Sequence, residues 1–528
     1  MSLSPVQREV ARHALAGVAE EMGLALLRAA YSPNIKERAD CSAAVFDAAG
    51  TMVAQAEHIP VHLGSMPASV QAVLARRGPL PPGTQVAVND PYAGGTHLPD
   101  LTLVAAVGDE PDASDGGRLL GYVANRAHHA DVGGAAPGSM PASATDIAME
   151  GVRIPPTVVA TAAGPRSDVL ELIAANSRTP AERHGDLRAQ LAANHVGARR
   201  LRELAARWGA EGLVTAMQEV CDYSDRRVRA AVAAIPDGAA EAEDVLEVDD
   251  GVTIRVRVTV AGDRITVDFA GTDAQVPVNM NAVRAVTVSA TWFVVRMLTD
   301  PDAPPNDGAY RCVTVHAPEG SVVAARAPAP VAAGNVETSQ RIVDVLLAAF
   351  AQLLPQRVPA ASQGTMNNLL IGAGASAAGP AFSYYETIAG GEGGTPQRAG
   401  MSGIHTGMTN TRNTPAEAME AAYPLRVWRA ELRHGTGGAG AHPGGDGVVR
   451  EVELLTDATL TLQTERRAVA PPGRAGGADG AVGRNVLVHR DGSEEELPSK
   501  GTWSLRVGER VRVETPGGGG WGPAPPEA

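Results

Sequence analysis

Cysteine is almost absent from this sequence. Its three cysteines, Cys41, Cys221 and Cys312, are scattered over 528 residues. That number and spacing fit neither a disulfide framework nor the paired cysteines of a zinc knuckle. Long apolar runs are also lacking, since no segment reaches the roughly 18 apolar residues of a membrane span and no signal-peptide pattern opens the chain. We therefore expect a cytoplasmic protein.

Positive charge is also in short supply. The chain has 45 Lys and Arg residues against 59 Asp and Glu residues, which gives a formal net charge of −14. Because Lys and Arg must neutralise phosphates, this balance opposes non-specific binding to nucleic acid. Aromatic residues make up only 3% of the chain, so Leu, Val, Ala and Met must fill the core.

The motifs of several enzyme classes are missing as well. No GxxxxGK[ST] phosphate loop occurs, so we do not expect this chain to bind ATP itself. Neither a GxSxG nucleophile elbow nor an HExxH zinc motif is found. Chemistry carried by those motifs is therefore not expected here.

Glycine and proline are abundant, with 59 and 38 residues that follow no period, which favours many ordered loops. A helix is predicted from Ser4-Pro5, where a capping hydroxyl precedes a proline at the first helical position. Its expected apolar stripe consists of Val6, Val10, Ala14, Val18, Met22 and Leu26. Further helices are predicted in 167–235 and 337–354, a hairpin in 251–269, and strands at 85–88, 101–107, 119–124, 448–462 and 502–513.

No internal repeat or long linker divides the chain. The pattern predicts an α+β protein, a single large interwoven unit of mixed sheets with packed helices and glycine-rich loops. Subregions are expected at 3–160 (metal site), 161–240 (helical), 245–355 (α/β) and 356–515 (glycine-rich β), followed by a tail at 516–528.

The segment from Asn89 to Asp100 is the most informative one. A predicted strand ends at Val88, and a loop with paired glycines then brings His97 and Asp100, three residues apart. Imidazole and carboxylate are good ligands for Zn²⁺ and also suit Mn²⁺ or Fe²⁺. The structural alternative is that Asp90 and Asp100 cap turns while His97 hydrogen-bonds to the backbone.

A second polar cluster follows the predicted strand at 119–124. It contains Arg126, His128, His129 and Asp131. Neighbours on a strand point to opposite faces, so His128 and His129 cannot both reach one ion easily. Asp131 shares a face with His129 if the strand continues, and could join His128 if the chain turns. Two such clusters at the ends of nearby strands predict a metal site.

Other polar residues are candidates for lining a substrate pocket. His58 and His62 are four residues apart, but Pro60 between them disfavours a regular helical metal pair. Arg153 could orient Glu150 or a substrate carboxylate, or form a structural ion pair. Residues 334–339 could cap a helix, and residues 362–368 and 385–391 could cradle an amide-rich ring or satisfy one another. Our substrate-binding candidates are Glu37, Arg38, Asp40, Asn89, Asp90, Arg126 and Glu386.

Several of these segments, taken in order, resemble the hydantoinase B/oxoprolinase family over residues 3–524. They are KERADCSAAVFD, HIPVHLGSMP, NDPYAGGTHLPDLTLV, RAHHADVGGAAPGSMP, EGVRIPP, GNVETSQRIVD, ASQGTMNN, YYETIAGGEGG and TPGGGGWG. The family includes one component of ATP-dependent N-methylhydantoinase, the C-terminal part of 5-oxoprolinase and the metal subunit of acetone carboxylase.

The resemblance implies a metal-dependent subunit of an ATP-dependent amidohydrolase in a hetero-oligomer. A hydantoinase A-type partner would use ATP to phosphorylate a cyclic amide or imide such as hydantoin, N-methylhydantoin or 5-oxoproline, and this chain would open the ring. One divalent ion (Mn, Zn or Fe) would be held by His97, Asp100 and His128, with His129 or Asp131 as the general base. The alternatives are a ketone carboxylase-type subunit and a non-catalytic scaffold.

Overall fold

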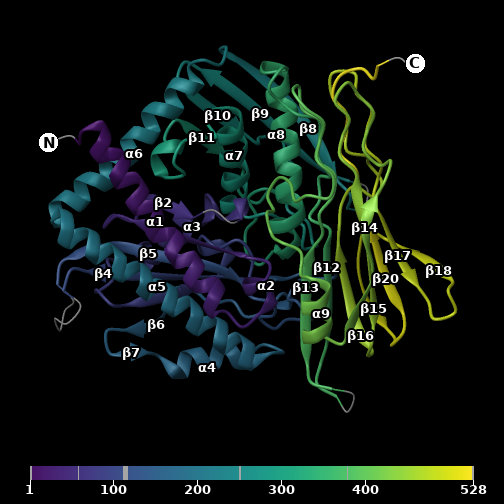
Figure 1. Ribbon diagram of the computed structural model, residues 1–528, viewed down its shortest axis with the longest axis horizontal. Coiled ribbons are helices and arrows are strands. Elements are labelled where there is room, and N and C mark those ends of the chain that lie inside the picture. The colour runs from purple at the N-terminus through teal and green to yellow at the C-terminus, as the bar shows by residue number, and fades with distance from the viewer. Residues whose placement is uncertain (1–2, 57–58, 111–116, 249–250, 377–378, 526–528) are drawn as a thin grey trace.

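The computed structural model describes residues 3–56, 59–110, 117–248, 251–376 and 379–525 and shows a mixed α+β fold, as predicted (Figure 1). The helices are α1 (Pro5–Ala29), α2 (Pro33–Lys36), α3 (Ser65–Arg77), α4 (Ser167–Ala175), α5 (Pro180–Trp208), α6 (Ala210–Val232), α7 (Arg284–Leu298), α8 (Ser339–Leu353) and α9 (Ala416–Ala422). None of them, within those ranges, is both long and apolar enough to cross a bilayer.

The strands form four sheets. The first has the order β2 (Met52–Ala56), β1 (Cys41–Phe46), β5 (Leu119–His128), β4 (Asp100–Gly108), β3 (Gln85–Val88), β6 (Thr157–Thr161) and β7 (Gly164–Pro165). The second has the order β11 (Val313–His316), β10 (Arg264–Asp268), β9 (Val252–Ala261) and β8 (Gly238–Leu246). The third has the order β13 (Phe382–Thr387), β12 (Asn368–Ala373), β16 (Ala458–Gln463) and β19 (Lys500–Leu505). The fourth has the order β14 (Leu425–Arg433), β15 (Gly447–Leu454), β20 (Arg510–Glu514), β17 (Arg484–Val488) and β18 (Glu494–Leu497).

The seven-stranded sheet is antiparallel throughout and lies between two layers of helices. Ala43 and Val45 of β1 pack into a core with α1, α5 and α6, whereas Ala44 and Phe46 pack into a core with α3. This is the alternation expected of a strand, with both faces covered, and it explains why β1 is apolar at almost every position. The sheet is a rigid base for the loops at its ends.

Helix α1 begins as predicted but buries a different stripe. Ser4 and Gln7 form a capping box, in which the Gln7 N–H donates to Ser4 Oγ (3.3 Å) and the Ser4 N–H donates to Gln7 Oε1 (2.9 Å). Val18, Met22 and Leu26 are buried, but Val6 and Val10 are exposed. Ala11 and Leu15 take their place, because the true period of 3.6 residues carries a strict four-residue repeat off the buried face.

The predicted hairpin at 251–269 is confirmed by β9 and β10. Val252, Ile254, Val256, Val258 and Val260 all point into the core, and Ala261 pairs with Arg264 across the turn. This sheet packs with α7 and α8 around the largest apolar core of the described residues. The predicted helix at 337–354 is an α-helix only from Ser339, since residues Gly334–Thr338 form a π-helical turn.

The glycine-rich C-terminal region packs backbone directly against backbone. The Gly438 N–H donates to Gly518 O (2.8 Å) and the Gly518 N–H donates to Gly445 O (2.9 Å). A Cβ atom added at Gly444 would lie 1.9 Å from Gly518 O, so no larger residue fits there without a backbone shift. These glycines therefore let irregular segments lie closer together than side chains would permit.

Candidate metal centre

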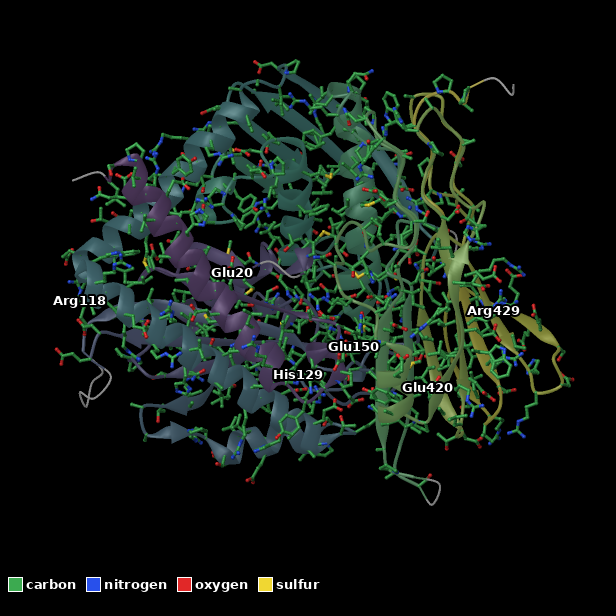
Figure 2. The ribbon with its side chains drawn as sticks, in the orientation of Figure 1. Glu20, Arg118, His129, Glu150, Glu420 and Arg429 are labelled. Carbon is green, nitrogen blue, oxygen red and sulfur yellow. The ribbon has the colours of Figure 1, made fainter. Side chains whose placement is uncertain are left out.

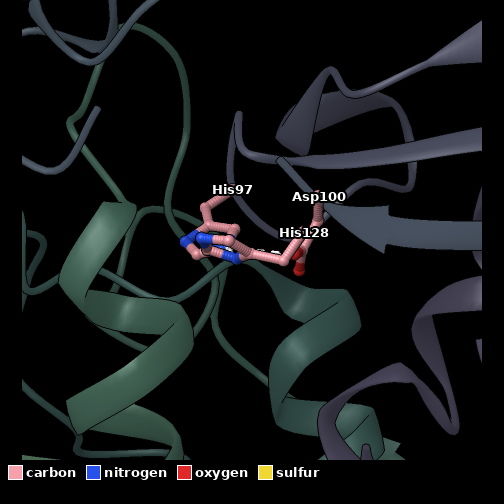
Figure 3. Close-up of side chains that lie close together, drawn as sticks. All are labelled: His97, Asp100 and His128. Carbon is pink, nitrogen blue, oxygen red and sulfur yellow. Dashed lines mark hydrogen bonds and ion pairs between the residues drawn. The ribbon is translucent and has the colours of Figure 1, made fainter. Parts of the chain in front are cut away.

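The register between β4 and β5 brings the two predicted clusters together. Asp100 is the first residue of β4 and His128 the last residue of β5, and these two residues are paired across the antiparallel ladder. Directly opposite residues in such a ladder project from the same face. His97, in the loop immediately before β4, reaches the same point (Figure 3).

Three ligand atoms form a nearly equilateral triangle. His97 Nε2 lies 3.2 Å from His128 Nδ1 and 3.2 Å from Asp100 Oδ1, and His128 Nδ1 lies 3.1 Å from Asp100 Oδ1. Metal–ligand bonds of about 2.0–2.2 Å place neighbouring donors about 3.0–3.4 Å apart in octahedral or tetrahedral coordination. All three side chains are buried. Their spacing and chemistry therefore fit one divalent cation.

The remaining polar atoms of the cluster are oriented by neighbours. His97 Nδ1 lies 3.2 Å from Ala332 O, and because a carbonyl oxygen can only accept, this nitrogen carries the proton. The lone pair of His97 Nε2 is thus turned toward Asp100 and His128. Asp100 Oδ2 accepts from Thr96 Oγ1 (2.5 Å) and Asn335 Nδ2 (3.3 Å), which leaves Oδ1 facing the imidazoles.

Asp100 and His128 have the protonation states that a metal requires, whereas His97 must give up a proton to bind one. Burial alone would raise the pKa of Asp100, but His97, His128 and His62 outweigh it and hold that pKa well below its ordinary range. Burial lowers the pKa of His128 to about 4, so this imidazole is neutral near pH 7. Burial also opposes protonation of His97, but the Asp100 charge raises the pKa of His97 above its ordinary value. The ionised Asp100 carboxylate therefore attracts positive charge, which can be a proton on His97 or a cation.

A small cavity adjoins two of the three ligands, Asp100 and His128. Its volume is about 20 Å³, enough for a water molecule. Its lining residues are Asp40, Ile59, Val61, His62, Asp100, His128, Asn335, Val336, Met366, Tyr385, Thr387, Thr409 and Thr411. They come from the first sheet and its loops, the π-helical turn and the third sheet region, so the site is complete only when distant parts of the chain meet.

Sequence and structure comparisons agree on a family. The sequence model of hydantoinase B/oxoprolinase matches residues 4–524. The chain belongs to the hydantoinase B/oxoprolinase family. It is 37% identical to 5-oxoprolinase 1 of Arabidopsis thaliana over 98% of this chain but only 42% of that enzyme, so it spans less than half of that relative. It is 31% identical to a Pseudomonas sp. protein named as the B component of a D-/L-hydantoinase, over 98% of this chain and 90% of that protein.

Two solved structures share the fold. The ATP-dependent caprolactamase of Pseudomonas jessenii superposes with a TM-score of 0.91 and 29% identity, over 100% of this chain and 93% of that one. An acetone carboxylase superposes with a TM-score of 0.89 and 18% identity, over 98% of this chain and 76% of that one. The second likeness concerns the fold alone.

In the present chain, His129 and Asp131 make contacts away from the ligand cluster. His129 Nε2 lies 2.9 Å from Gln190 Oε1 on α5, which agrees with the expectation that His128 and His129 point to opposite faces. Asp131 accepts from the Gly133 N–H (3.0 Å) and from both the N–H and the guanidinium of Arg178 (3.0 Å each). Both side chains are thus engaged in holding the loop after β5.

Of the seven substrate-binding candidates, only Asp40 lines the cavity. Burial raises the pKa of Asp40 to about 6, although Arg38 lowers it. Arg38 itself is fully buried and donates to Asn34 Oδ1 (2.6 Å), Tyr385 O (2.6 Å) and Thr387 Oγ1 (2.8 Å). It therefore joins the first and third sheet regions rather than facing the cavity.

The other candidates stabilise loops around the site. Asn89 donates to Leu98 O and Val152 O, and Arg126 donates to Thr102 Oγ1 and Ser69 Oγ. Asp90 lies 3.8 Å from Arg153, and Glu386 lies 3.2 Å from Arg450. Glu37 is half-buried at the end of α2. Glu150, which Arg153 was expected to orient, is buried near the centre of the molecule (Figure 2). Its carboxylate accepts hydrogen bonds from two backbone N–H groups.

His62, a candidate for lining the pocket, does line the cavity. Its Nε2 lies 3.5 Å from Asp100 Oδ2 and its Nδ1 lies 2.9 Å from Ser42 Oγ, whereas His58 lies outside the described residues. Sequence reasoning missed other residues that contact the ligands. Asn335 is predicted from its position only to cap a helix. Thr96 could have been found, since it stands beside His97 in the same loop, but nothing local marks Ala332.

Proposed function

We propose that this chain is the metal-dependent subunit of an ATP-dependent amidohydrolase that opens a cyclic amide or imide. The observation that carries the proposal is the triangle formed by His97 Nε2, His128 Nδ1 and Asp100 Oδ1 beside a small cavity. The proposal is also supported by relatives named as 5-oxoprolinase, as a hydantoinase component and as caprolactamase. An amide resists hydrolysis because its resonance must be broken, which explains the need for ATP.

The division of labour follows from the residues present. The sequence has no GxxxxGK[ST] loop, the motif that commonly holds the phosphates of ATP. We therefore assign phosphorylation of the substrate's carbonyl oxygen to a hydantoinase A-type partner. Water then adds to the phosphorylated carbon, and the ring C–N bond breaks as nitrogen takes up a proton, which leaves an acyl phosphate. A second water hydrolyses the acyl phosphate to a carboxylate and inorganic phosphate.

His97, Asp100 and His128 would hold the divalent ion in this proposal. When bound there, Mn²⁺, Zn²⁺ or Fe²⁺ would supply Lewis-acid chemistry, lowering the pKa of water and stabilising negative charge on oxygen. Asp40 is our candidate for the group that takes the proton from the attacking water and returns it to the leaving nitrogen, because its carboxyl lines the cavity. His129 and Asp131 support the neighbouring loop instead.

The test is co-expression with the A-type partner, followed by a panel of hydantoins, 5-oxoproline and lactams scored for ATP-dependent ring-opened product. We expect one ring class to be opened by the wild-type complex. His97→Ala should abolish both bound metal and product while partner ATPase activity remains measurable. His195→Ala, which removes an exposed imidazole from α5, is the matched control and should behave as wild type.

The alternatives give different outcomes. Full turnover by His97→Ala would refute the metal-dependent assignment and favour a scaffold that leaves all chemistry to the partner. A product that requires bicarbonate and a ketone, with no ring opened, would favour a carboxylase. These outcomes are separated by mass spectrometry of the product and metal analysis of the purified chain.

A further inference from the structure

One short segment from a distant part of the sequence contacts two of the three candidate ligands and is connected to the third through other side chains. Residues 332–337 precede α8 and include most of the π-helical turn Gly334–Thr338. The ligands lie more than 200 positions earlier in the chain. Single π-helical turns occur mostly within longer helices and often at functional sites. The segment is linked to the three ligands by a backbone carbonyl, by an amide side chain and by a relay of hydrogen bonds.

The first contact fixes the tautomer of His97. Ala332 O accepts from His97 Nδ1 at 3.2 Å, so the other ring nitrogen presents its lone pair to the ligand cluster. A backbone carbonyl at this position is a common way to orient a metal-ligating imidazole. The contact uses only the backbone of residue 332, so it cannot be predicted from the residue type at that position.

The second contact gives the two Asp100 oxygens different partners. Asn335 Nδ2 donates to Asp100 Oδ2 at 3.3 Å, and Thr96 Oγ1 donates to the same oxygen at 2.5 Å. Asp100 Oδ1 is thereby the oxygen that faces His97 and His128. Asn335 also lines the small cavity, so it acts at the edge of the site itself.

The third contact is a relay of hydrogen bonds that ends in a ring stack. Glu337 Oε1 accepts from Asn368 Nδ2 (2.7 Å), and Asn368 Oδ1 accepts from the Tyr385 hydroxyl (2.9 Å). The Tyr385 ring stacks on His128, with centroids 4.7 Å apart and planes 24° apart. His128 Nε2 is buried with no hydrogen-bond partner among the described residues, so stacking takes the place of the usual second hydrogen bond.

The segment is itself firmly held. The Glu150 carboxylate accepts the N–H groups of Val331 (3.1 Å) and Ala332 (2.9 Å). A Cβ atom at Gly334 would lie 1.8 Å from Asn281 O, so the turn lies directly against the backbone before α7. A rigid support of this kind is what a metal site needs if its ligands are to stay within a few tenths of an ångström of their positions.

We propose that Asn335 and Tyr385 are positioning residues for the metal-ligating triad, with residues 332–337 acting as one device that aligns all three ligands. This inference rests on the proposed function, since it concerns the same metal. The device predicts that metal affinity and coordination geometry depend on residues that do not bind the ion.

The test uses Co²⁺ bound to the purified full chain, with affinity measured by competition and geometry by visible absorption. Asn335→Ala and Tyr385→Leu should each weaken binding by roughly 10- to 100-fold and change the absorption bands. Two buried controls match them. Asn279→Ala removes a side chain that donates to Pro141 O, and Tyr384→Leu alters the neighbour of Tyr385 on the opposite face of β13. Both should bind Co²⁺ within about twofold of wild type.

Tyr385→Phe separates a positioning role from a general packing role. It keeps the ring stack and loses the bond to Asn368, so its affinity should fall between wild type and Tyr385→Leu, and it provides a readout if the leucine variant does not fold. Wild-type affinity and spectrum in both Asn335→Ala and Tyr385→Phe would overturn the inference, as would equal losses in the controls. Co²⁺ binding that does not depend on His97 would instead refute the proposed function.

Discussion

Two buried polar clusters in this molecule differ in how their charges are matched. The ionic network consists of Asp244, Arg341, Asp344, Glu465 and Arg466. Arg341 lies 2.8 Å from both Asp244 and Glu465. Arg466 lies 2.9 Å from Asp244 and 2.5 Å from Asp344. Each carboxylate of the network therefore has a guanidinium beside it, and Lys500 also contacts Glu465.

The ligand cluster of His97, Asp100 and His128 is matched in a different way. The described ion-pair partners of Asp100 are all histidines. Two of those imidazoles turn nitrogen atoms toward one point rather than away from it. The network is therefore closed by its own charges, whereas under the proposed function a cation from outside would complete the cluster. Burial by itself does not distinguish a structural from a functional site, but the matching of charge does.

The largest expected effect is the loss of metal from Asp100→Asn. This change removes the negative charge of the ligand triangle while leaving its volume almost unchanged. We expect metal content to fall to background and turnover with the partner to fall by about 10⁴-fold or more, because water activation is lost. Metal analysis and product assay measure this. Metal retained at wild-type level would erase the contrast between the two clusters.

Asp40→Asn should separate metal binding from proton transfer within the same site. We expect a loss of about 10²- to 10⁴-fold in turnover, the range typical of a missing general acid–base group. Metal content should stay at the wild-type level, because Asp40 lines the cavity and is not part of the triangle. A variant with normal turnover would show that another group moves the proton.

Arg341→Met should lower the stability of the protein without lowering its metal content, whereas Asp100→Asn should lower the metal content. Removing Arg341 leaves Asp244 paired only with Arg466 and Glu465 paired only with Lys500. Breaking a buried network by removing one partner typically costs about 3–5 kcal/mol of stability. We expect that loss in urea unfolding, with metal content per folded chain unchanged. Arg255→Met, which breaks an exposed pair with Glu243 at 2.8 Å, is the control and should cost less than about 1 kcal/mol.

Chelation should lower the free energy of unfolding of proteins that keep the ligand cluster and leave that of a variant without it unchanged. A ligand present at 100 times its dissociation constant stabilises the folded state by about 2.7 kcal/mol. We therefore expect a chelator to lower the free energy of unfolding of wild type and of Arg341→Met by a similar amount. It should leave Asp100→Asn unchanged. An equal effect on all three proteins would mean that the stabilising ion binds elsewhere.

The sequence was sufficient to predict the parts of the site that local chemistry encodes. The strand end at Val88, before His97, followed from periodicity, and so did the strand at 119–124, although that strand continues to His128. The opposite orientation of His128 and His129 followed from the pleat. The mixed α+β class also followed, because hairpin and helix signals alternate along the chain. The apolar stripe of α1 was displaced at Val6 and Val10, since a spacing of four residues only approximates the helical repeat.

Contacts between distant segments could not be predicted in this way. The interaction of Ala332 with His97 uses a backbone carbonyl, and any residue supplies one. Asn335 and Glu337 resemble helix-capping residues because a helix does follow, and only the fold shows that they face Asp100 and Asn368. Such contacts depend on how two sheets and a turn pack together, which a single sequence does not specify.

The last expected effect concerns the pH dependence of stability at Glu337, which lies between the two clusters. Burial and the neighbouring charge of Glu465 raise the pKa of Glu337 to about 8, although Lys500 and the bonds from Thr365 and Met366 oppose the shift. The folded chain thus holds this proton at pH values where the unfolded chain, with an ordinary carboxyl, has lost it. Stability should therefore be greatest below about pH 4.5 for this group and fall as pH rises toward 8, by at most about 1.4 kcal/mol per pH unit.

Glu337→Gln isolates that contribution, because the amide oxygen can still accept from Asn368 while the group no longer titrates. We expect urea unfolding of the variant to depend less on pH between about 5 and 8 than that of wild type. The ionic network should contribute little to this difference, since its carboxylates are matched by guanidinium groups that stay charged throughout. A pH profile identical to that of wild type would place the titrating group elsewhere, and would leave Glu337 with only its hydrogen bond to the relay that ends at His128.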